Sequence, residues 1–144
     1  MTYLDTSVLA AVFFREPTAR AVAAALRAHA KDKLTISGWT LTEMASVAAL
    51  KERTGVVSPD ARDNALRAFH RFASTELHVV EVETFDFRSA ARLIEQVTNL
   101  RAGDALHLAV AHRLEARIAT LDRRLAQAAA ARGVALLDLL PIDL

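Results

Sequence analysis

The feature that most constrains the fold is an alternation between short β-prone runs and longer stretches of one or two helical segments. Five runs have the composition of strands: Thr2–Leu4, Leu34–Ile36, Leu77–Val82, Arg117–Leu121 and Val134–Leu137. Seven segments have a helical pattern: Thr6–Phe14, Ala19–Ala30, Trp39–Arg53, Ser58–Ser74, Phe85–Val97, Ala102–Ala116 and Arg123–Arg132. Because strands separated by such helices need crossover connections, we expect an α/β fold with a mostly parallel sheet and helices on both faces.

The composition is that of an ordinary folded protein. With 144 residues, 53% of them hydrophobic and 24% charged, the chain can bury a core, and we expect a single domain spanning residues 1–144. It has no Cys, which excludes a disulfide framework, a thiolate zinc site and a cysteine nucleophile. No apolar run reaches the roughly 18 residues of a membrane span, and the start lacks the basic region of a signal peptide. We therefore expect a cytoplasmic protein without membrane association.

Four acidic residues lie in places where a solvated surface acid is not expected: Asp5, Glu43, Asp104 and Asp122. Asp5 follows an apolar strand and precedes an apolar helix, which fits a helix N-cap and a ligand at a sheet edge equally well. Glu43 is in the middle of a helix, and its neighbours one turn away include no cation. An unpaired carboxylate in a buried place is unfavourable, so a ligand role for Glu43 is favoured over a packing role.

Asp104 and Asp122 each have a simple local explanation as well. Asp104 lies in the first turn of an apolar helix, where the helix dipole favours an acid by only about 0.3–1 kcal/mol. Because that helix is expected to be internal, a long-range role is modestly favoured for Asp104. Asp122 lies at a strand-to-helix junction, where an N-cap is favoured over a functional role when the residue is considered alone.

Considered together, the four acids predict a metal site. The carboxyl ends of parallel strands meet at one edge of the sheet, so the four carboxylates could gather there. Two carboxylates about 5 Å apart repel by roughly 3 kcal/mol at an effective dielectric of 20, so the group has to protonate or bind a cation. Oxygen ligands without Cys select a hard ion, Mg²⁺ or Mn²⁺, present as one ion or as a pair. Such an ion can activate water and orient a phosphate group.

The motifs around these acids resemble those of PIN-domain nucleases. They are Leu4-Asp5-Thr6-Ser7-Val8-Leu9, Glu43 in the helix after the second strand, Arg101-Ala-Gly-Asp104-Ala-Leu-His-Leu-Ala and Thr120-Leu-Asp122-Arg-Arg-Leu. The similarity covers nearly the whole chain, whose compact size most resembles the VapC toxins of bacterial type II toxin–antitoxin pairs. The resemblance implies a three-layer α/β/α sandwich and an endoribonuclease that depends on Mg²⁺ or Mn²⁺. It also implies an RNA substrate, a cognate VapB-type antitoxin and a homodimer.

The same resemblance implies roles for individual residues. The metal-binding and catalytic acids are then Asp5, Glu43, Asp104 and Asp122. Hydroxyl groups beside these acids match the supporting positions of the family, and they belong to Thr6, Ser7 and Thr120.

Other residues near the predicted acidic edge have less certain roles. Arg101, Arg123 and Arg124 either balance the local acidic charge or contact RNA phosphates, and the two interpretations are equally favoured. His107, one turn after Asp104, is expected to be a packed or hydrogen-bonding core residue rather than a catalytic one.

Two other functions are consistent with the sequence. A non-catalytic PIN-like binding module would use the four acids only as helix caps, and Mg²⁺ would not stabilise it. An aspartyl-phosphate phosphatase would use the acid after the first strand as its nucleophile. The chemistry of such enzymes is typical of an Asp-x-Asp motif after the first strand. This chain has Asp5 at the first acidic position of that motif but Ser7 at the second.

Overall fold

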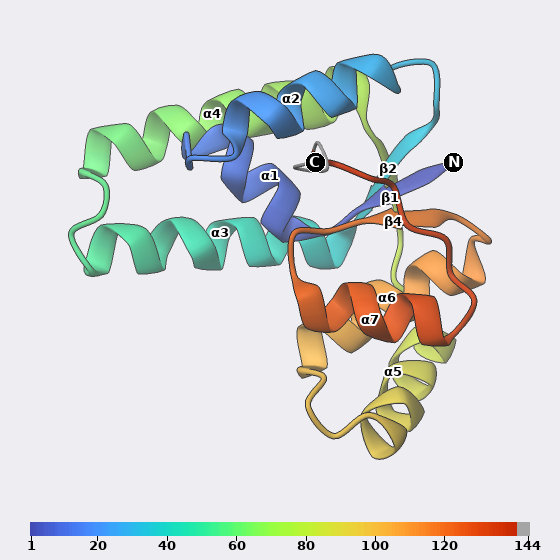
Figure 1. Cartoon of the computed structure of the whole chain (residues 1–144). Coiled ribbons are helices and arrows are strands. Elements are labelled where there is room, and N and C mark those ends of the chain that lie inside the picture. The colour runs from blue at the N-terminus through green and yellow to red at the C-terminus, as the bar shows by residue number, and fades with distance from the viewer. Residues whose placement is uncertain (141–144) are drawn as a thin grey trace.

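A sheet of four parallel strands forms the centre of the molecule, whose computed structural model describes residues 1–140 (Figure 1). The last four residues of the predicted domain, 141–144, lie outside the described part. The strands are β1 (Thr2–Leu4), β2 (Leu34–Ser37), β3 (His78–Val80) and β4 (Arg117–Ala119). Their order is β3-β2-β1-β4, and every neighbouring pair is parallel. The predicted parallel sheet is confirmed, and β1 is an interior strand.

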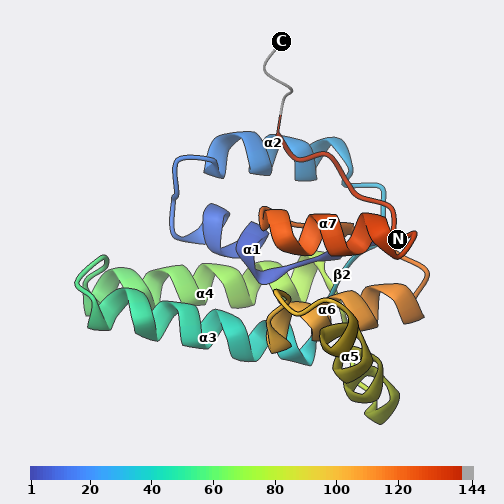
Figure 2. The ribbon, with the colours of Figure 1, turned by 60° about the horizontal axis from the view of Figure 1, so that its bottom comes forward.

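Helices cover both faces of this sheet, which makes the fold the predicted three-layer α/β/α sandwich. They are α1 (Thr6–Phe13), α2 (Ala19–Ala28), α3 (Gly38–Arg53), α4 (Pro59–Glu76), α5 (Thr84–Gln96), α6 (Ala102–Arg113) and α7 (Arg123–Ala131). In Figure 1, α1, α2 and α4 lie above the sheet, and α5, α6 and α7 lie below it. The α3–α4 pair extends past the sheet to the left in both ribbon views (Figures 1 and 2).

Each face of the sheet packs against its own hydrophobic core, because successive side chains of a strand point to opposite faces. Tyr3 of β1 belongs to the core that contains α6 and α7, together with Ile118 of β4. The next residue, Leu4, belongs to the core that contains α1 and α4. Tyr3 is therefore directed toward α6, and this direction determines which groups its hydroxyl can reach.

Helix α6 is the internal helix that the sequence predicts. Residues 105–111 are all buried, which means that every side of the helix is covered by protein. The helix is only 12 residues long, and no helix in residues 1–140 is both long and apolar enough to cross a lipid bilayer.

The prediction of a fifth strand at Val134–Leu137 is wrong. The segment makes a single parallel bridge, Ile118 with Leu136, in which Ile118 N donates to the carbonyl of Ala135 (2.8 Å) and Leu137 N donates to the carbonyl of Ile118 (2.9 Å). Val134 and Leu137 are buried, whereas Ala135 and Leu136 between them are exposed. Buried positions three residues apart do not fit the two-residue period of a strand, so the pairing does not continue.

The core between α1 and α4 provides a test of the packing. Phe69 of α4 is fully buried, and its ring lies 5.7 Å from the ring of Phe13, centroid to centroid. We expect Phe69→Ala to lower the free energy of unfolding by about 3–5 kcal/mol, because it removes a buried ring and leaves a cavity. Phe87→Ala is the control, since that ring is 56% exposed and its loss should change stability by only about 0.5 kcal/mol. Urea denaturation of both variants measures the difference, and equal losses would contradict the assignment of this core.

Candidate metal centre

The candidate site forms where three parallel strands end at the same edge of the sheet. Asp5 follows β1, Ser37 is the last residue of β2, and Thr120 follows β4. A backbone hydrogen bond also joins the ends of β1 and β4 at this edge: Asp5 N donates to the carbonyl of Ala119 at 3.0 Å. Residues that are more than 100 positions apart in the sequence therefore become neighbours.

Asp5 is held by hydroxyl groups rather than by helix-capping hydrogen bonds. Its side chain is almost fully buried, and Oδ2 accepts hydrogen bonds from Ser7 Oγ (2.6 Å) and Thr120 Oγ1 (2.7 Å). Although Asp5 occupies the N-cap position of α1, its carboxylate accepts no capping hydrogen bond from the backbone of that helix. The two hydroxyls predicted to lie beside this acid are in direct contact with it, and the carboxylate is free of the capping role.

Glu43 projects from α3 and is paired, contrary to the expectation of an unpaired carboxylate. Its Oε1 accepts a hydrogen bond from Thr6 Oγ1 at 2.6 Å and lies 2.5 Å from His107 Nε2. The side chain is 26% exposed, so one part of it faces solvent. Burial acts to raise the pKa of Glu43. The hydrogen bond and the electrostatic attraction of His107, together with the hydrogen bond from Thr6, outweigh burial, and the pKa is lowered from its ordinary value.

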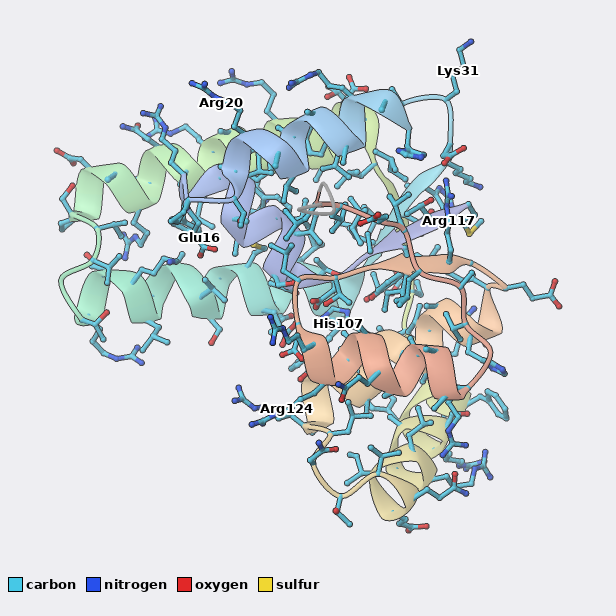
Figure 3. The ribbon with its side chains drawn as sticks, viewed as in Figure 1. Glu16, Arg20, Lys31, His107, Arg117 and Arg124 are labelled. Atoms are coloured by element: carbon cyan, nitrogen blue, oxygen red, sulfur yellow. The ribbon has the colours of Figure 1, made fainter. Side chains whose placement is uncertain are left out.

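The sequence predicted that His107 is a packed or hydrogen-bonding core residue, but it did not predict the partners of its ring nitrogens. It is fully buried, as expected, and its Nδ1 lies 2.7 Å from the hydroxyl of Tyr3. Its Nε2 approaches Asp5 Oδ1 at 3.5 Å in addition to Glu43. Figure 3 shows His107 near the middle of the molecule, where the two helical layers meet at the sheet. The available signal was the combination of a mid-helix acid in one helix with a histidine inside the apolar run of another.

Asp104, in the first turn of α6, feels the charge of the other acids. Its pKa is raised to about 6 by burial first, and then by the negative charges of Asp5, Asp122 and Glu43. This is the electrostatic signature expected for carboxylates gathered at one place without a cation between them. Asp104 lies outside the tightest group, which consists of Asp5, Glu43 and His107.

Asp122 has the capping role that its position in the sequence suggests. It is the N-cap of α7, and its Oδ1 accepts hydrogen bonds from the backbone N–H groups of Arg124 (2.8 Å) and Leu125 (3.0 Å). Its charge nevertheless acts on Asp104, so it also contributes to the acidic edge. Capping and proximity to the site are therefore compatible in this residue.

Gly103 allows α6 to approach α3 closely beside the acids. A Cβ atom at this position would lie 2.8 Å from Glu43 Oε2 and 3.2 Å from Cζ2 of Trp39. The indole Nε1 of Trp39 would be 3.3 Å away, and it is buried without a hydrogen-bond partner among the described residues. Lack of space, rather than the backbone conformation, disfavours a larger residue here.

The residues present have the chemistry of a divalent cation site. Asp5, Glu43 and His107 each offer a ligand atom, and these atoms lie within 4.8 Å of one another. The negative charges of Asp5, Asp122 and Glu43 add to burial in raising the pKa of Asp104, which indicates a further carboxylate near this group. A set dominated by carboxylate oxygens suits Mg²⁺ or Mn²⁺.

The three arginines predicted near this edge are all exposed: Arg101, Arg123 and Arg124. Figure 3 shows Arg124 projecting outward from the first turn of α7. Their contact with RNA stays a prediction.

The raised pKa of Asp104 generates a pH-dependent prediction for the protein in EDTA. Asp104 has a higher pKa in the folded state than in the unfolded state, so its ionisation destabilises the fold as the pH rises through about 6. Asp104→Asn should therefore raise the free energy of unfolding at pH 7.5 by about 1 kcal/mol, a value reduced for partial exposure to solvent. The gain should disappear below about pH 4, where the carboxyl is protonated in both states.

Urea denaturation at a series of pH values measures this effect. Glu115→Gln is the matched control, because that carboxyl is exposed and precedes β4, at the edge of the sheet opposite the acids. A gain that does not depend on pH, or no gain at pH 7.5, would show that repulsion among the acids is weak.

Several solved structures share this fold. A chain of VapBC2 from Rickettsia felis, bound to a DNA fragment from its promoter, superposes with a TM-score of 0.70 at 17% identity, covering 96% of this chain and 98% of that one. FitAcB from Neisseria gonorrhoeae gives a TM-score of 0.67 at 19% identity, covering 96% and 97%. VapC20 from Mycobacterium tuberculosis, described as a toxin that cleaves the sarcin–ricin loop, gives 0.64 at 19% identity, covering 89% and 95%.

Sequence comparison gives the family. No curated protein sequence matches this chain. The family model described as PIN domain matches residues 2–131, a range that includes every acid of the candidate site and nearly all of the described fold. The chain therefore belongs to the PIN domain family.

Proposed function

We propose that this protein is a divalent-metal-dependent endoribonuclease that acts as the toxin of a type II toxin–antitoxin pair. The observation that carries the proposal is the meeting of Asp5 and Glu43 at the carboxyl edge of the sheet. Asp104 is a further carboxylate near them, and its pKa is raised to about 6 by burial first and then by the charges of Asp5, Asp122 and Glu43. A fold that gathers acids in this way is unfavourable without a cation. Membership of the PIN family gives the same indication independently.

The residues proposed to hold Mg²⁺ or Mn²⁺ are Asp5, Glu43, Asp104 and Asp122. When bound, such an ion supplies Lewis acidity to a phosphodiester and makes water more acidic. The chain itself supplies orientation: Ser7 and Thr120 fix the carboxylate of Asp5 by hydrogen bonds of 2.6 and 2.7 Å. A carboxylate that is already fixed loses less conformational entropy when it binds an ion or orients a substrate.

The substrate proposed for this site is RNA. Arg101, Arg123 and Arg124 lie in the first turns of α6 and α7 or directly before them, next to Asp104 and Asp122, and all three are exposed. Exposed guanidinium groups beside an acidic centre are well placed to contact phosphates on either side of the bond that is cut. VapC20, which shares the fold, is described as a toxin that cleaves the sarcin–ricin loop.

The partner proposed for this toxin is a VapB-type antitoxin, and a homodimer is the proposed toxin assembly. VapBC2 and FitAcB share the fold over almost the full length of the chain, and VapBC2 is described as bound to DNA of its own promoter. We infer from these relatives that the present chain also works beside an antitoxin.

A substitution at Asp5 tests the nuclease directly. Asp5→Asn keeps the size of the side chain but removes its charge, so Mn²⁺-dependent cleavage of RNA should fall by more than about 100-fold. Purified wild-type and variant proteins are compared for RNA cleavage with Mn²⁺ and with EDTA, and circular dichroism verifies that the variant is folded. Glu115→Gln changes an exposed acid that precedes β4, at the opposite edge of the sheet, and should cleave like the wild type. Full activity of folded Asp5→Asn would overturn the proposal, and a wild-type protein that Mn²⁺ neither activates nor stabilises would favour a non-catalytic binding module.

The close packing at Gly103 gives a second test. In Gly103→Ala the new methyl group would meet Glu43 Oε2 at 2.8 Å, so the carboxylate has to move away from its present position. We expect Mn²⁺ affinity, measured by calorimetry, to fall about 10-fold. Gly38→Ala is the matched control, since a Cβ atom there meets nothing within 4 Å and should leave Mn²⁺ affinity unaltered. Equal Mn²⁺ affinities of the two variants would show that Glu43 does not belong to the metal site.

A further inference from the structure

A chain of hydrogen bonds runs from the interior of the sheet to the acids and passes through His107. Ser37 Oγ lies 2.8 Å from the Tyr3 hydroxyl, which lies 2.7 Å from His107 Nδ1. On the other side of the ring, His107 Nε2 lies 2.5 Å from Glu43 Oε1. Tyr3, Ser37 and His107 are all completely buried, so water does not compete for these contacts.

The chemistry of these groups determines which atom donates in each of these hydrogen bonds. An ionised carboxylate can only accept hydrogen bonds, so the contact with Glu43 places a proton on His107 Nε2. In a neutral imidazole the other nitrogen is then an acceptor, and Nδ1 accepts from the Tyr3 hydroxyl. Tyr3 has one proton to donate, so its oxygen accepts from Ser37. The order is Ser37 to Tyr3 to His107 to Glu43, with each hydroxyl and the imidazole donating once.

This direction decides between two roles for His107. Its Nε2 lies within 4.8 Å of ligand oxygens of Asp5 and Glu43, so the distances alone would also fit a nitrogen ligand for a cation. A nitrogen that carries a proton has no lone pair in the ring plane to give to a metal. As long as the Tyr3 hydroxyl donates a hydrogen bond to Nδ1, the proton of the neutral ring stays on Nε2, which donates it to Glu43 Oε1.

Each carboxylate is held on one oxygen and open on the other. Glu43 Oε1 takes the hydrogen bonds of Thr6 and His107, whereas no group among residues 1–140 donates a hydrogen bond to Oε2. Asp5 Oδ2 takes those of Ser7 and Thr120, and its Oδ1 meets only the longer 3.5 Å approach of His107 Nε2. The pattern leaves one oxygen of each acid available as a ligand and fixes its orientation through the other.

We propose that His107 is a positioning residue and not a metal ligand: its Nε2–H, kept on that nitrogen by the Tyr3 hydroxyl, holds Glu43 Oε1 and thereby presents Oε2 to the cation. The inference deepens the proposed function, on which its metal-binding part rests. The hydrogen-bond chain itself exists in the metal-free protein and can be examined separately.

The first experiment locates the proton and the metal bonds of His107. In metal-free protein labelled with ¹⁵N-histidine, NMR should show Nε2 protonated and Nδ1 unprotonated, with His107→Gln used to assign the signals. After addition of Mn²⁺, pulsed EPR should show no directly bonded histidine nitrogen. A directly bonded ¹⁵N that disappears in His107→Gln would overturn the positioning role. A proton on Nδ1, alone or on both nitrogens, would overturn the role of Tyr3.

The second experiment measures the effect on Mn²⁺ affinity by calorimetry. Tyr3→Phe removes the hydroxyl that fixes the tautomer, and His107→Asn removes the group that reaches Glu43, so each should weaken Mn²⁺ binding about 10- to 100-fold. His107→Gln places an amide N–H near the position of Nε2 and should restore affinity to within about threefold of the wild type. Phe69→Leu, in the other core, controls for a loss of stability alone and should bind Mn²⁺ normally.

The outcomes separate this inference from the proposed function. If wild-type protein binds no Mn²⁺, the proposed function fails, while NMR still decides the direction of the hydrogen-bond chain. If wild-type protein binds Mn²⁺ and His107→Gln is no better than His107→Asn, the positioning role fails and the metal site remains.

Discussion

The repulsion between carboxylates at one edge of the sheet is the constraint on which the rest of this structure depends. Asp5 is nearly completely buried and Glu43 is partly buried, and both remain acceptors of short hydrogen bonds from hydroxyl groups and an imidazole. These donors offset part of the unfavourable energy of bringing the charges together. The part of the repulsion that these donors do not offset acts on Asp104, whose pKa is raised by burial and by the charges of the other acids. The edge therefore combines three acids fixed by hydrogen-bond donors, Asp5, Glu43 and Asp122, with Asp104, whose pKa responds to burial and to the local charge.

The parallel topology is what makes such a concentration of charge possible. With β1 between β2 and β4, the residue after β1 has strand ends on both sides, and these supply Ser37 and Thr120. The alternation of side chains along β1 then sends Tyr3 to the α6 layer and Leu4 to the α1 layer. A shift of one residue in β1 would exchange these two directions and remove the hydroxyl from His107. The register of a three-residue strand thus determines whether the histidine has a partner.

Much of this fold could be predicted from the sequence because its signals are local. The alternation of strands and helices, the buried character of α6 and the meeting of strand ends at one edge follow from hydrophobic patterns and chain topology. The fifth strand was wrong because four residues carry too little pattern to distinguish a strand from a single bridge. The pairing of Glu43 with His107 joins residues 64 positions apart, and no local pattern reveals which side chains will face each other across two helices.

Asp5 and Asp122 show most clearly where local reasoning ends. Each follows a strand and occupies the N-cap of the next helix, so the sequence offers the same explanation for both. Asp122 accepts two backbone hydrogen bonds in that role, whereas the carboxylate of Asp5 is taken by the hydroxyls of Ser7 and Thr120. Thr120 comes from a strand that is adjacent only in the folded sheet. The difference between a cap and a candidate ligand is therefore decided by which hydroxyls tertiary structure brings to the acid, and that information is absent from the residues on either side of it.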